Sequence, residues 1–275
     1  MMKMFISPDS PFLTTDTRAK RWAIPYYPEC VNGRIDVLLE RNINALAGKS
    51  VLDVGSHIGT FAWAALQLGA KQVHGIDVEE RTVKRCEDLF RQEGVSPSTY
   101  KFEARDIFEF LEDVEENAFD TVLCFGVMYY MAEPHRLLKL MARAAKETIL
   151  LDTFTAAYSA VQGKDAPTTH PHLTEKVLNL PMMMVAPTQA EKKDYRLPES
   201  FDCKGRDLSL TTLPTHALLE LWFESLGLRW EQLDWSKYIT RPCSFKDLLT
   251  PEQKLSSRWA DVYASGIRAS YKLEL

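Results

Sequence analysis

Short apolar runs alternate with amphipathic segments between residues 49 and 154, and this alternation restricts the chain to few folds. The apolar runs are rich in β-branched and aliphatic residues, which favour strands. They read "KSVLDVG", "QVHGID", "TYKFEARD", "DTVLCFG" and "ETILLDTF". Helical spacing predicts one helix in "GTFAWAALQLGA", a second in "EERTVKRCEDLFRQEG" and a third around Arg136–Ala145. Strands and helices that alternate in this way form right-handed βαβ units, so we expect a parallel sheet covered on both faces.

The pattern changes after residue 154. Residues 155–210 contain several prolines and the methionine run "PMMMV", and they are too many for a plain loop, so we expect an inserted cap. Regular spacing returns in "THALLELWFESLG", which predicts a helix, and in "LRWEQLDWSKY" and "GIRASYKLEL", which predict strands. Two such late strands indicate an antiparallel pair at the edge of the sheet. The predicted fold class is therefore α/β, with a seven-stranded, mostly parallel, doubly wound sheet.

Net charge, the length of the apolar runs and the spacing of the cysteines make some classes of function less favourable. The formal net charge of −5 argues against a protein whose main task is to hold polyanions, although it leaves room for a local basic patch. No apolar run approaches the ~20 residues that span a bilayer, and the N-terminus has no secretory pattern. The five cysteines are dispersed and none forms CxxC, which favours reduced thiols and a cytoplasmic location. They are Cys30, Cys86, Cys124, Cys203 and Cys243.

The loop after the first strand, "VLDVGSHIGTF", decides between classes of nucleotide ligand. A dinucleotide fingerprint would require glycine at the positions of Gly55, His57 and Thr60, and only the first matches. Asp53 would face the pyrophosphate, and the loop contains no Lys or Arg to offset that repulsion. A P-loop is excluded because no GK[ST] follows. The loop therefore argues against a nicotinamide-dependent oxidoreductase.

Acids follow neighbouring strands of the predicted sheet. Asp53, Asp77 and Asp106 come at the ends of the first three strands, where ligands of open α/β sheets bind. Asp77 comes about eighteen residues after Gly59, the interval typical of a ribose-binding acid. S-adenosylmethionine has no phosphate and carries a sulfonium and an ammonium, so acids near its methionine end are favourable. The looser spacing D-x-G-x-x-x-G in "DVGSHIG" is sufficient for such a ligand.

Four segments in this order resemble the class I S-adenosylmethionine-dependent methyltransferases. They are "VLDVGSHIGTF", "VHGIDVEE", "FEARDIFE" and "FDTVLCFGVMYYMAEP", and the resemblance covers Lys49 to about Thr153. It implies the seven-stranded sheet of that family and S-adenosylmethionine as the cofactor. It also implies a set of cofactor-binding residues: Asp53, Gly55, Ser56, His57, Gly59, Asp77, Val78, Asp106, Ile107, Phe125 and Gly126.

The resemblance assigns these residues to parts of the cofactor. Asp53 and Gly55 would border the methionine moiety, and Asp77 would bind the ribose hydroxyls. Asp106 would contact the adenine amino group, with the Ile107 backbone nearby. The pair that follows the fourth strand, Phe125–Gly126, would line the methionine and transfer region. The family often has glycine or another small residue at position 57, so His57 departs from its pattern.

A narrower likeness concerns the segment "CFGVMYYMAEP". It resembles the "GVLYH…P" segment of methyltransferase-like enzymes that modify the wobble uridine of tRNA, with Tyr130 in place of the histidine. The basic residues that those enzymes use for a carboxylated cofactor are not evident in the sequence. We treat the likeness as an indication of subfamily and not as a substrate assignment.

Catalytic and substrate-binding candidates come from the same regions. Tyr129 and Tyr130 follow the fourth strand and would face the transferred methyl group, and the aromatic N-terminal arm adds Tyr26 and Tyr27 as substrate contacts. The arm is interpreted as covering the cofactor or contacting nucleic acid. The candidate bases are His57, Tyr130 and His135. No metal site is predicted, because His170 and His172 in "THPH" lack a third ligand at suitable spacing.

These observations predict one domain in four parts. Residues 1–48 form an N-terminal arm and helix, residues 49–154 a Rossmann-like cofactor-binding half, residues 155–210 the cap and substrate region, and residues 211–275 a C-terminal helix and edge strands.

The predicted function is in-line methyl transfer to a small, partly apolar molecule. Modification of a tRNA wobble nucleoside and a non-catalytic cofactor-binding module are the alternatives. The sequence assigns neither the acceptor, nor the methylated element, nor the oligomeric state.

Overall fold

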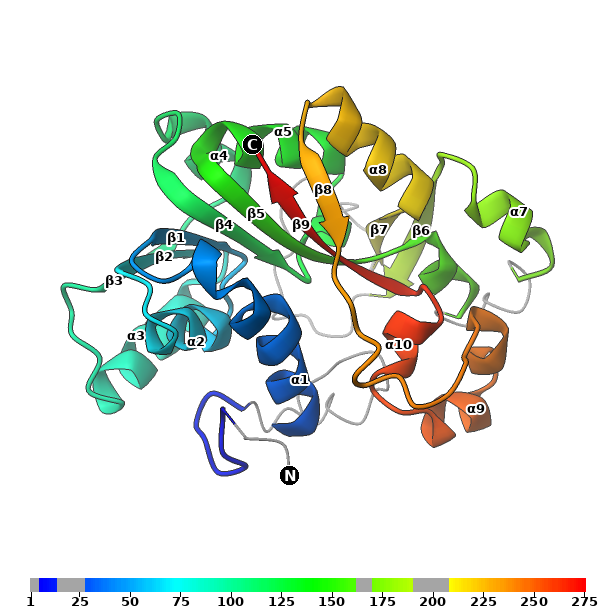
Figure 1. The fold of residues 1–275 in the computed structure, drawn as a ribbon, viewed down its shortest axis with the longest axis horizontal. Coiled ribbons are helices and arrows are strands. Elements are labelled where there is room, and N and C mark those ends of the chain that lie inside the picture. Colours follow the sequence, from blue (N-terminus) through cyan, green and yellow to red (C-terminus); the bar gives the residue numbers. More distant parts are fainter. Residues whose placement is uncertain (1–4, 14–27, 162–169, 190–207) are drawn as a thin grey trace. The chain divides into compact units, whose positions relative to one another are not determined.

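The structure is a computed structural model that describes residues 5–13, 28–161, 170–189 and 208–275 (Figure 1). The chain divides into two compact units. The first unit comprises residues 1–125, 140–150 and 275, and the second comprises residues 126–139 and 151–274. Among the described residues, no helix is both long enough and apolar enough to cross a membrane.

The central element is a seven-stranded sheet in the order β3-β2-β1-β4-β5-β9-β8. Its strands are β1 (Ser50–Val54), β2 (Gln72–Asp77), β3 (Tyr100–Ala104), β4 (Phe119–Phe125), β5 (Ala145–Phe154), β8 (Arg229–Gln232) and β9 (Arg268–Glu274). The pairings β1–β2, β2–β3 and β1–β4 are parallel, whereas β8–β9 is antiparallel. The predicted seven-stranded, mostly parallel sheet is therefore confirmed.

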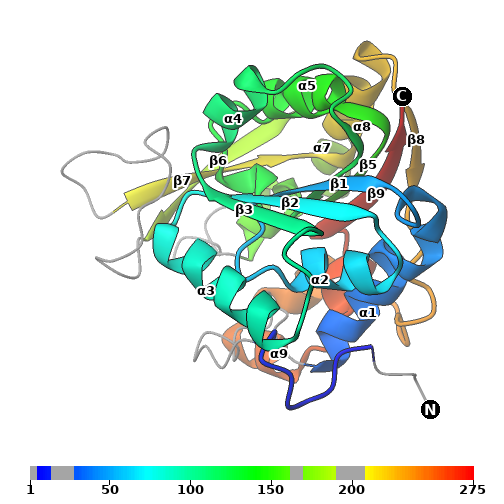
Figure 2. The same cartoon turned by 90° about the vertical axis from the view of Figure 1, so that its left-hand side faces the viewer.

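Helices cover both faces of the strands in the first unit. Figure 2 shows α3 (Glu80–Gln92) and α4 (Ile107–Asp113) on opposite faces of β1, β2 and β3. The buried side of α3 carries an apolar stripe at helical spacing: Val83, Cys86, Leu89 and Phe90. The remaining helical elements of this unit are α1 (Pro28–Leu38), η2 (Glu40–Ala45) and α2 (Thr60–Gln67).

The described part of the N-terminal arm is anchored to the first unit. Ile6 and Phe12 are buried, and the Phe12 ring lies 5.0 Å from the Trp63 ring of α2 and 5.7 Å from the Phe90 ring of α3. The Thr60 hydroxyl donates a hydrogen bond to the Phe12 carbonyl oxygen at 2.9 Å. The arm therefore contacts the first turn of α2, which directly follows the glycine loop.

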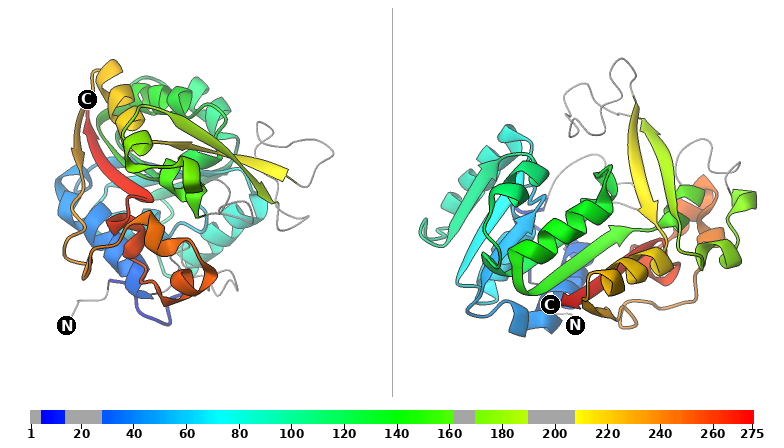
Figure 3. Two further views of the ribbon diagram at one scale, coloured as in Figure 1. Left: turned by 90° about the vertical axis from the view of Figure 1, so that its right-hand side faces the viewer. Right: turned by 90° about the horizontal axis from the view of Figure 1, so that it is seen from above.

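The second unit contains a separate two-stranded antiparallel sheet, formed by β6 (Met183–Gln189) and β7 (Leu208–Pro214) and visible in Figure 3. The methionine run of the sequence thus forms part of a strand, which its composition did not predict. The predicted C-terminal helix is observed as α8 (His216–Ser225). The other helical elements are η3 (Met128–Tyr130), α5 (Pro134–Ala144, shared with the first unit), η4 (Ala156–Ala160), η5 (His170–His172), α7 (Glu175–Leu178), η7 (Phe245–Leu248), α9 (Pro251–Ser256) and α10 (Asp261–Ala264).

Two further elements differ from the sequence-based expectation. The strand predicted over residues 228–238 ends at Gln232, because the Asp234 carboxylate accepts a hydrogen bond from the Ser236 N–H and turns the chain. Helix α4 was not predicted, and its N-cap is Asp106, whose carboxylate accepts hydrogen bonds from the N–H groups of Phe108 and Glu109.

Gly59 closes the loop between β1 and α2 in a conformation that only glycine adopts easily. Its φ is +76°, and a Cβ atom there would lie 2.4 Å from the Cys86 sulfur and 2.7 Å from a Phe90 ring carbon. Gly94, which follows α3, has a φ of +69°, but a Cβ atom added there would have no other atom within 4 Å. A comparison of alanine variants at these two positions therefore separates the free-energy cost of backbone strain from that of steric overlap.

We predict that Gly59→Ala lowers the free energy of unfolding by about 2–4 kcal/mol, because strain and overlap add. The matched variant Gly94→Ala is expected to lose only about 1 kcal/mol, from strain alone. Chemical denaturation of both variants measures the difference. Equal losses would show that α3 moves away from the loop without resistance.

Candidate functional site

Asp53 is buried at the carboxyl end of a central strand. It lies in β1, in register with Gly75 of β2 and Leu123 of β4, and its exposed fraction is only 3%. The N–H group of Ala62 in α2 favours the ionised form of the carboxylate and lowers its pKa. Its Oδ2 atom has no hydrogen-bond partner among the described residues, and the same holds for the buried Ser56 Oγ. Unsatisfied buried polar atoms of this kind are rare in folded proteins.

Burial also changes the protonation of Asp53. Loss of solvation raises its pKa from 3.8 to about 7, and the nearby charge of Asp77 adds to the increase. The Ala62 N–H acts in the opposite direction, but its effect is smaller. A cation placed next to Oδ2 would favour the ionised carboxylate, so the site is electrostatically suited to a positively charged ligand and unsuited to a phosphate.

The glycine loop is fixed to the end of β2 by its backbone. The N–H groups of Gly55 and Ser56 both donate hydrogen bonds to the Ile76 carbonyl oxygen, at 2.8 and 2.9 Å. Three loop residues have positive φ: Gly55 at 73°, His57 at 49° and Gly59 at 76°. The chain therefore turns tightly between β1 and α2.

Asp77 at the end of β2 completes this loop. Its Oδ2 accepts a hydrogen bond from the His57 N–H at 2.9 Å, and its Oδ1 accepts one from the Glu79 N–H at 3.1 Å. Burial raises the pKa of Asp77, and these two N–H groups limit the increase. Each carboxylate oxygen has a further lone pair, so Asp77 retains the capacity to accept hydrogen bonds from a diol. His57 acts on this acid in two ways, through its backbone N–H and through the charge of its side chain, which also lowers the pKa of Asp77.

The residues that are predicted to lie near the adenine follow the ends of β2 and β3. Val78 is 41% exposed, whereas Ile107 is buried in the first turn of α4. Asp106 has a structural role as the N-cap of α4, through its Oδ1. Its contact with an adenine stays a prediction, as does that of Ile107.

The segment after β4 begins with two residues of the predicted site. The Phe125 ring meets the Phe61 ring edge-on at 5.1 Å. Gly126 has a φ of +82° and donates its N–H to the Asp152 carbonyl oxygen at 2.8 Å. A Cβ atom on Gly126 would lie 3.1 Å from the Arg268 guanidinium, which would have to shift slightly, and the positive φ itself favours glycine at this position.

The catalytic and substrate candidates are dispersed. Tyr129 is buried, with its ring 4.4 Å from the half-buried Tyr130 ring. His135 is exposed on the first turn of α5, where its ring lies 5.5 Å from Trp222. Tyr26 and Tyr27 lie outside the described residues. The described residues contain no group of three potential metal ligands, and His172 is exposed.

Sequence reasoning missed a buried ion pair in the second unit. The Arg268 guanidinium of β9 binds the Asp152 Oδ2 of β5 through both Nε and Nη2 at 2.9 Å, and it lies 4.6 Å from the centre of the Phe154 ring. The Ser270 hydroxyl donates a hydrogen bond to Asp152 Oδ1 at 2.9 Å. The two charges are more than a hundred residues apart in the sequence, so no local pattern could have indicated this pair.

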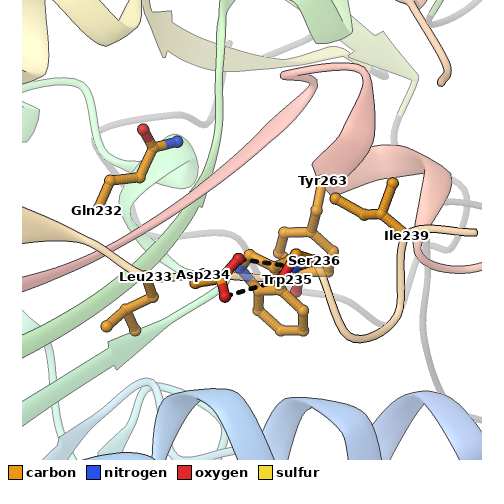
Figure 4. Close-up of a pocket in the computed structure, with 7 residues that line it drawn as sticks. All are labelled: Gln232, Leu233, Asp234, Trp235, Ser236, Ile239 and Tyr263. Atoms are coloured by element: carbon orange, nitrogen blue, oxygen red, sulfur yellow. Dashed lines mark hydrogen bonds between the residues drawn. The ribbon is translucent and has the colours of Figure 1, made fainter.

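The second unit also contains a pocket of about 450 Å³, and Figure 4 shows the residues that line it. Its wall contains Trp235 and Tyr263, whose rings stack 3.5 Å apart, and the Trp235 Nε1–H donates a hydrogen bond to Ser270 Oγ at 3.2 Å. The lining residues are Gln232, Leu233, Asp234, Trp235, Ser236, Ile239 and Tyr263. An aromatic wall with a polar rim suits a small molecule of mixed polarity.

Comparison with known proteins identifies related chains. The model of a methyltransferase domain family matches residues 45–197. The tRNA U34 carboxymethyltransferase of Helicobacter pylori is 34% identical over 122 residues, which make up 42% of this chain and 44% of that protein. The ubiquinone biosynthesis O-methyltransferase of Idiomarina loihiensis is 32% identical over 108 residues, 39% of this chain and 42% of that protein. The chain thus matches less than half the length of these curated relatives.

Solved structures share the fold. An S-adenosylmethionine dependent methyltransferase from Mesorhizobium loti aligns with a TM-score of 0.55 at 14% identity, over 88% of this chain and 98% of that chain. At this level of identity the likeness concerns the arrangement of strands and helices. It confirms the predicted class I architecture.

We predict that Asp53 makes the unliganded protein less stable as the pH rises. Because burial raises its folded pKa to about 7 above an unfolded value near 3.8, its contribution to the free energy of unfolding is full at low pH. That contribution is lost as the pH increases through about 7. Between pH 5 and pH 8 the wild type should lose about 2–4 kcal/mol relative to Asp53→Asn in chemical denaturation.

The matched control is Asp88→Asn, at a side chain that is 47% exposed on α3. The difference in the free energy of unfolding between Asp88→Asn and the wild type should not vary with pH by more than about 0.5 kcal/mol. A difference between Asp53→Asn and the wild type that is constant over the same range would mean that Asp53 stays ionised in the folded protein.

Proposed function

The chain belongs to the S-adenosylmethionine-dependent methyltransferases, and we propose that it transfers the methyl group to a small, partly apolar acceptor by in-line displacement. The observation that supports the site most directly is the buried Asp53 carboxylate, which has an unpartnered oxygen beside Asp77 at the ends of adjacent strands. The residues fit the cofactor because its methionine end carries two positive charges and no part of it is a phosphate.

We assign the cofactor-binding roles as follows. Asp53 neutralises the cationic end, and Asp77 accepts hydrogen bonds from the ribose hydroxyls. The first residues of α4, Asp106 and Ile107, border the adenine. The segment Phe125–Gly126 borders the methionine portion.

When bound, S-adenosylmethionine supplies an electrophilic methyl carbon attached to a positively charged sulfur. The protein's own contribution is to hold both reactants in line and to exclude water. The aromatic pair Phe61 and Phe125, whose rings meet at 5.1 Å, supplies apolar surface at the end of β4. Gly126 gives this segment a backbone with a φ of +82°, which residues with a side chain adopt only at a cost.

An oxygen acceptor with an ordinary hydroxyl also requires a base. Of the three candidates, we favour Tyr130, because it lies four residues after Gly126 in the transfer segment. His57 and His135 remain the other two. A carboxylate or thiolate acceptor would need no base, so the identity of the acceptor decides whether Tyr130 moves a proton.

We propose that the pocket beside Trp235 and Tyr263, which lies within the second unit, binds a small molecule of mixed polarity. It follows the carboxyl end of β8, and its wall is hydrogen-bonded through Ser270 to Asp152, whose carbonyl oxygen accepts the Gly126 N–H. The proposal includes a cytoplasmic location, which is supported by four described cysteines that are all free thiols.

Calorimetry and an acceptor panel test this function together. We predict that S-adenosylhomocysteine binds with one site per chain, and that Asp77→Asn weakens its affinity about tenfold because the ribose hydroxyls lose a charged acceptor. The control Asp88→Asn should bind like the wild type. Release of S-adenosylhomocysteine from S-adenosylmethionine in the presence of small phenols, carboxylic acids or thiols identifies the acceptor class.

Two results would contradict the proposal. If calorimetry detected no heat of binding for S-adenosylhomocysteine, the assignment of the cofactor site would be wrong. Tight binding without turnover on any acceptor would indicate the non-catalytic cofactor-binding module instead.

A tRNA acceptor is the second candidate, because the Helicobacter pylori relative is a tRNA U34 carboxymethyltransferase. That alignment covers 42% of this chain, and the net charge of −5 does not favour polyanions. We predict no binding of bulk tRNA at 150 mM salt in a filter or mobility-shift assay. Binding that weakens steeply with salt, together with methyl incorporation into tRNA, would establish this candidate in place of the small molecule.

A further inference from the structure

The described part of the N-terminal arm, residues 5–13, is held at both of its ends by helices of the first unit, and we call it the arm segment. At its first end, the buried Asn32 side chain of α1 accepts hydrogen bonds from the N–H groups of Phe5 and Ile6. The Asn32 amide also donates a hydrogen bond to the Ile6 carbonyl oxygen at 2.9 Å. Because this side chain binds both donors and an acceptor of the arm backbone, it fixes the path of the arm segment.

At its other end, the arm segment is linked to the glycine loop by two separate contacts of Phe12. The Phe12 carbonyl oxygen accepts the hydrogen bond of Thr60, the residue directly after Gly59. The Phe12 ring meets the Phe90 ring edge-on at 5.7 Å. The Phe90 ring in turn packs against Gly59, where a Cβ atom would lie 2.7 Å from it. Backbone and side chain of Phe12 are therefore both connected to the residue that ends the loop.

The first turn of α2 is part of the same cluster. The Trp63 ring contacts two rings of the arm segment, Phe12 at 5.0 Å and Phe5 at 5.9 Å. The Trp63 N–H donates a hydrogen bond to the Gly59 carbonyl oxygen at 2.8 Å, which closes the first turn of the helix. Release of the arm segment would expose these rings to water and remove a support of that turn.

The glycine loop depends on such support because its backbone conformation is costly. His57 has a φ of 49°, in the left-handed region that residues with a side chain rarely adopt. Conformations of this kind persist only where the surrounding structure holds them. On the β2 side, the loop is held by hydrogen bonds to Ile76 and Asp77. On the α2 side, the arm segment holds it through Thr60 and Phe90.

We propose that the arm segment is a positioning element of the cofactor site, whose docking keeps the glycine loop in the conformation that binds S-adenosylmethionine. The inference rests on the proposed cofactor site and adds a determinant of its affinity. Asn32 and Thr60 are then positioning residues, which act on the cofactor through the arm segment and the loop. Because coupling between two equilibria is reciprocal, docking strengthens cofactor binding by the same factor by which bound cofactor strengthens docking.

A purely structural role is the competing explanation. In that case the arm segment would stabilise the first unit by burying Ile6 and Phe12, and its docking would be the same with and without a ligand. The two roles therefore differ in reciprocity. Only a positioning element both changes the affinity for the cofactor and responds to its binding.

Calorimetry of S-adenosylhomocysteine binding tests the effect of the arm segment on affinity. We expect Thr60→Val, which removes the hydroxyl, and Asn32→Leu, which removes the bonds to the arm backbone, each to weaken binding about three- to tenfold. The control for Thr60→Val is Thr121→Val, whose hydroxyl donates to a backbone carbonyl oxygen from the amino-terminal half of β4. The control for Asn32→Leu is Asn42→Leu, whose amide donates to two carbonyl oxygens of α1. Both controls should bind within about twofold of the wild type.

Hydrogen exchange read by mass spectrometry tests the reverse effect. In the wild type, saturating S-adenosylhomocysteine should slow amide exchange in residues 5–13 by about three- to tenfold, which matches the loss of affinity in the variants. In Thr60→Val this slowing should be smaller, because one link between the arm segment and the loop is removed. Protection of the β4 amides in the same experiment shows that each variant is folded.

Three results would overturn the proposal. The first is wild-type affinity in both Asn32→Leu and Thr60→Val, or exchange in the arm segment that the ligand leaves unchanged. The second is a loss of affinity in the two controls equal to that in the arm variants, which would indicate general destabilisation. The third is a wild type that does not bind S-adenosylhomocysteine, which would overturn the proposed cofactor site itself and is a different failure.

Discussion

The burial of a carboxylate at the end of β1 is the constraint around which the first unit is organised. Asp53 lies between two neighbouring strands, with one oxygen unpartnered among the described residues, and its desolvation raises the pKa to about 7. Asp77 on the next strand increases the electrostatic strain. A folded protein gains nothing from this arrangement by itself, so its physical rationale is the ligand whose positive charge relieves it. The tight loop that follows β1 has positive φ at Gly55, His57 and Gly59, and its backbone is hydrogen-bonded to the end of β2.

The second unit contains a buried acid whose two oxygens are both hydrogen-bonded, in contrast to Asp53. Asp152 is as deeply buried as Asp53, but both of its oxygens have partners, from Arg268 and from Ser270. A satisfied network of this kind fixes the positions of its members. It connects the aromatic wall of the pocket, through Trp235 and Ser270, to the backbone of Gly126. One aspartate is therefore prepared for a ligand, whereas the other holds the structure around the transfer segment in place.

The accuracy of the sequence-based expectations depended on how local each signal was. Strand β2 was predicted at the residues where it occurs, and the buried face of α3 was read directly from its apolar spacing. Helix α4 was missed because Asp106 had been interpreted as a site acid, although its carboxylate also caps a helix. The strands β6 and β7 were missed because their prolines and methionines carry no alternating pattern, and their pairing joins residues far apart in the chain.

The sequence by itself determined the class of fold, and it predicted the strand ends at which the ligand binds and that this ligand is not a diphosphate. These follow from periodicity, spacing and charge, which are properties of neighbouring residues. Only the tertiary structure decided which charges are buried: Asp53 without a full set of partners, Arg34 against Phe61, and Arg268 on Asp152. Burial depends on what distant segments place around a residue, and the free energy of a charge depends on that surrounding more than on its own identity.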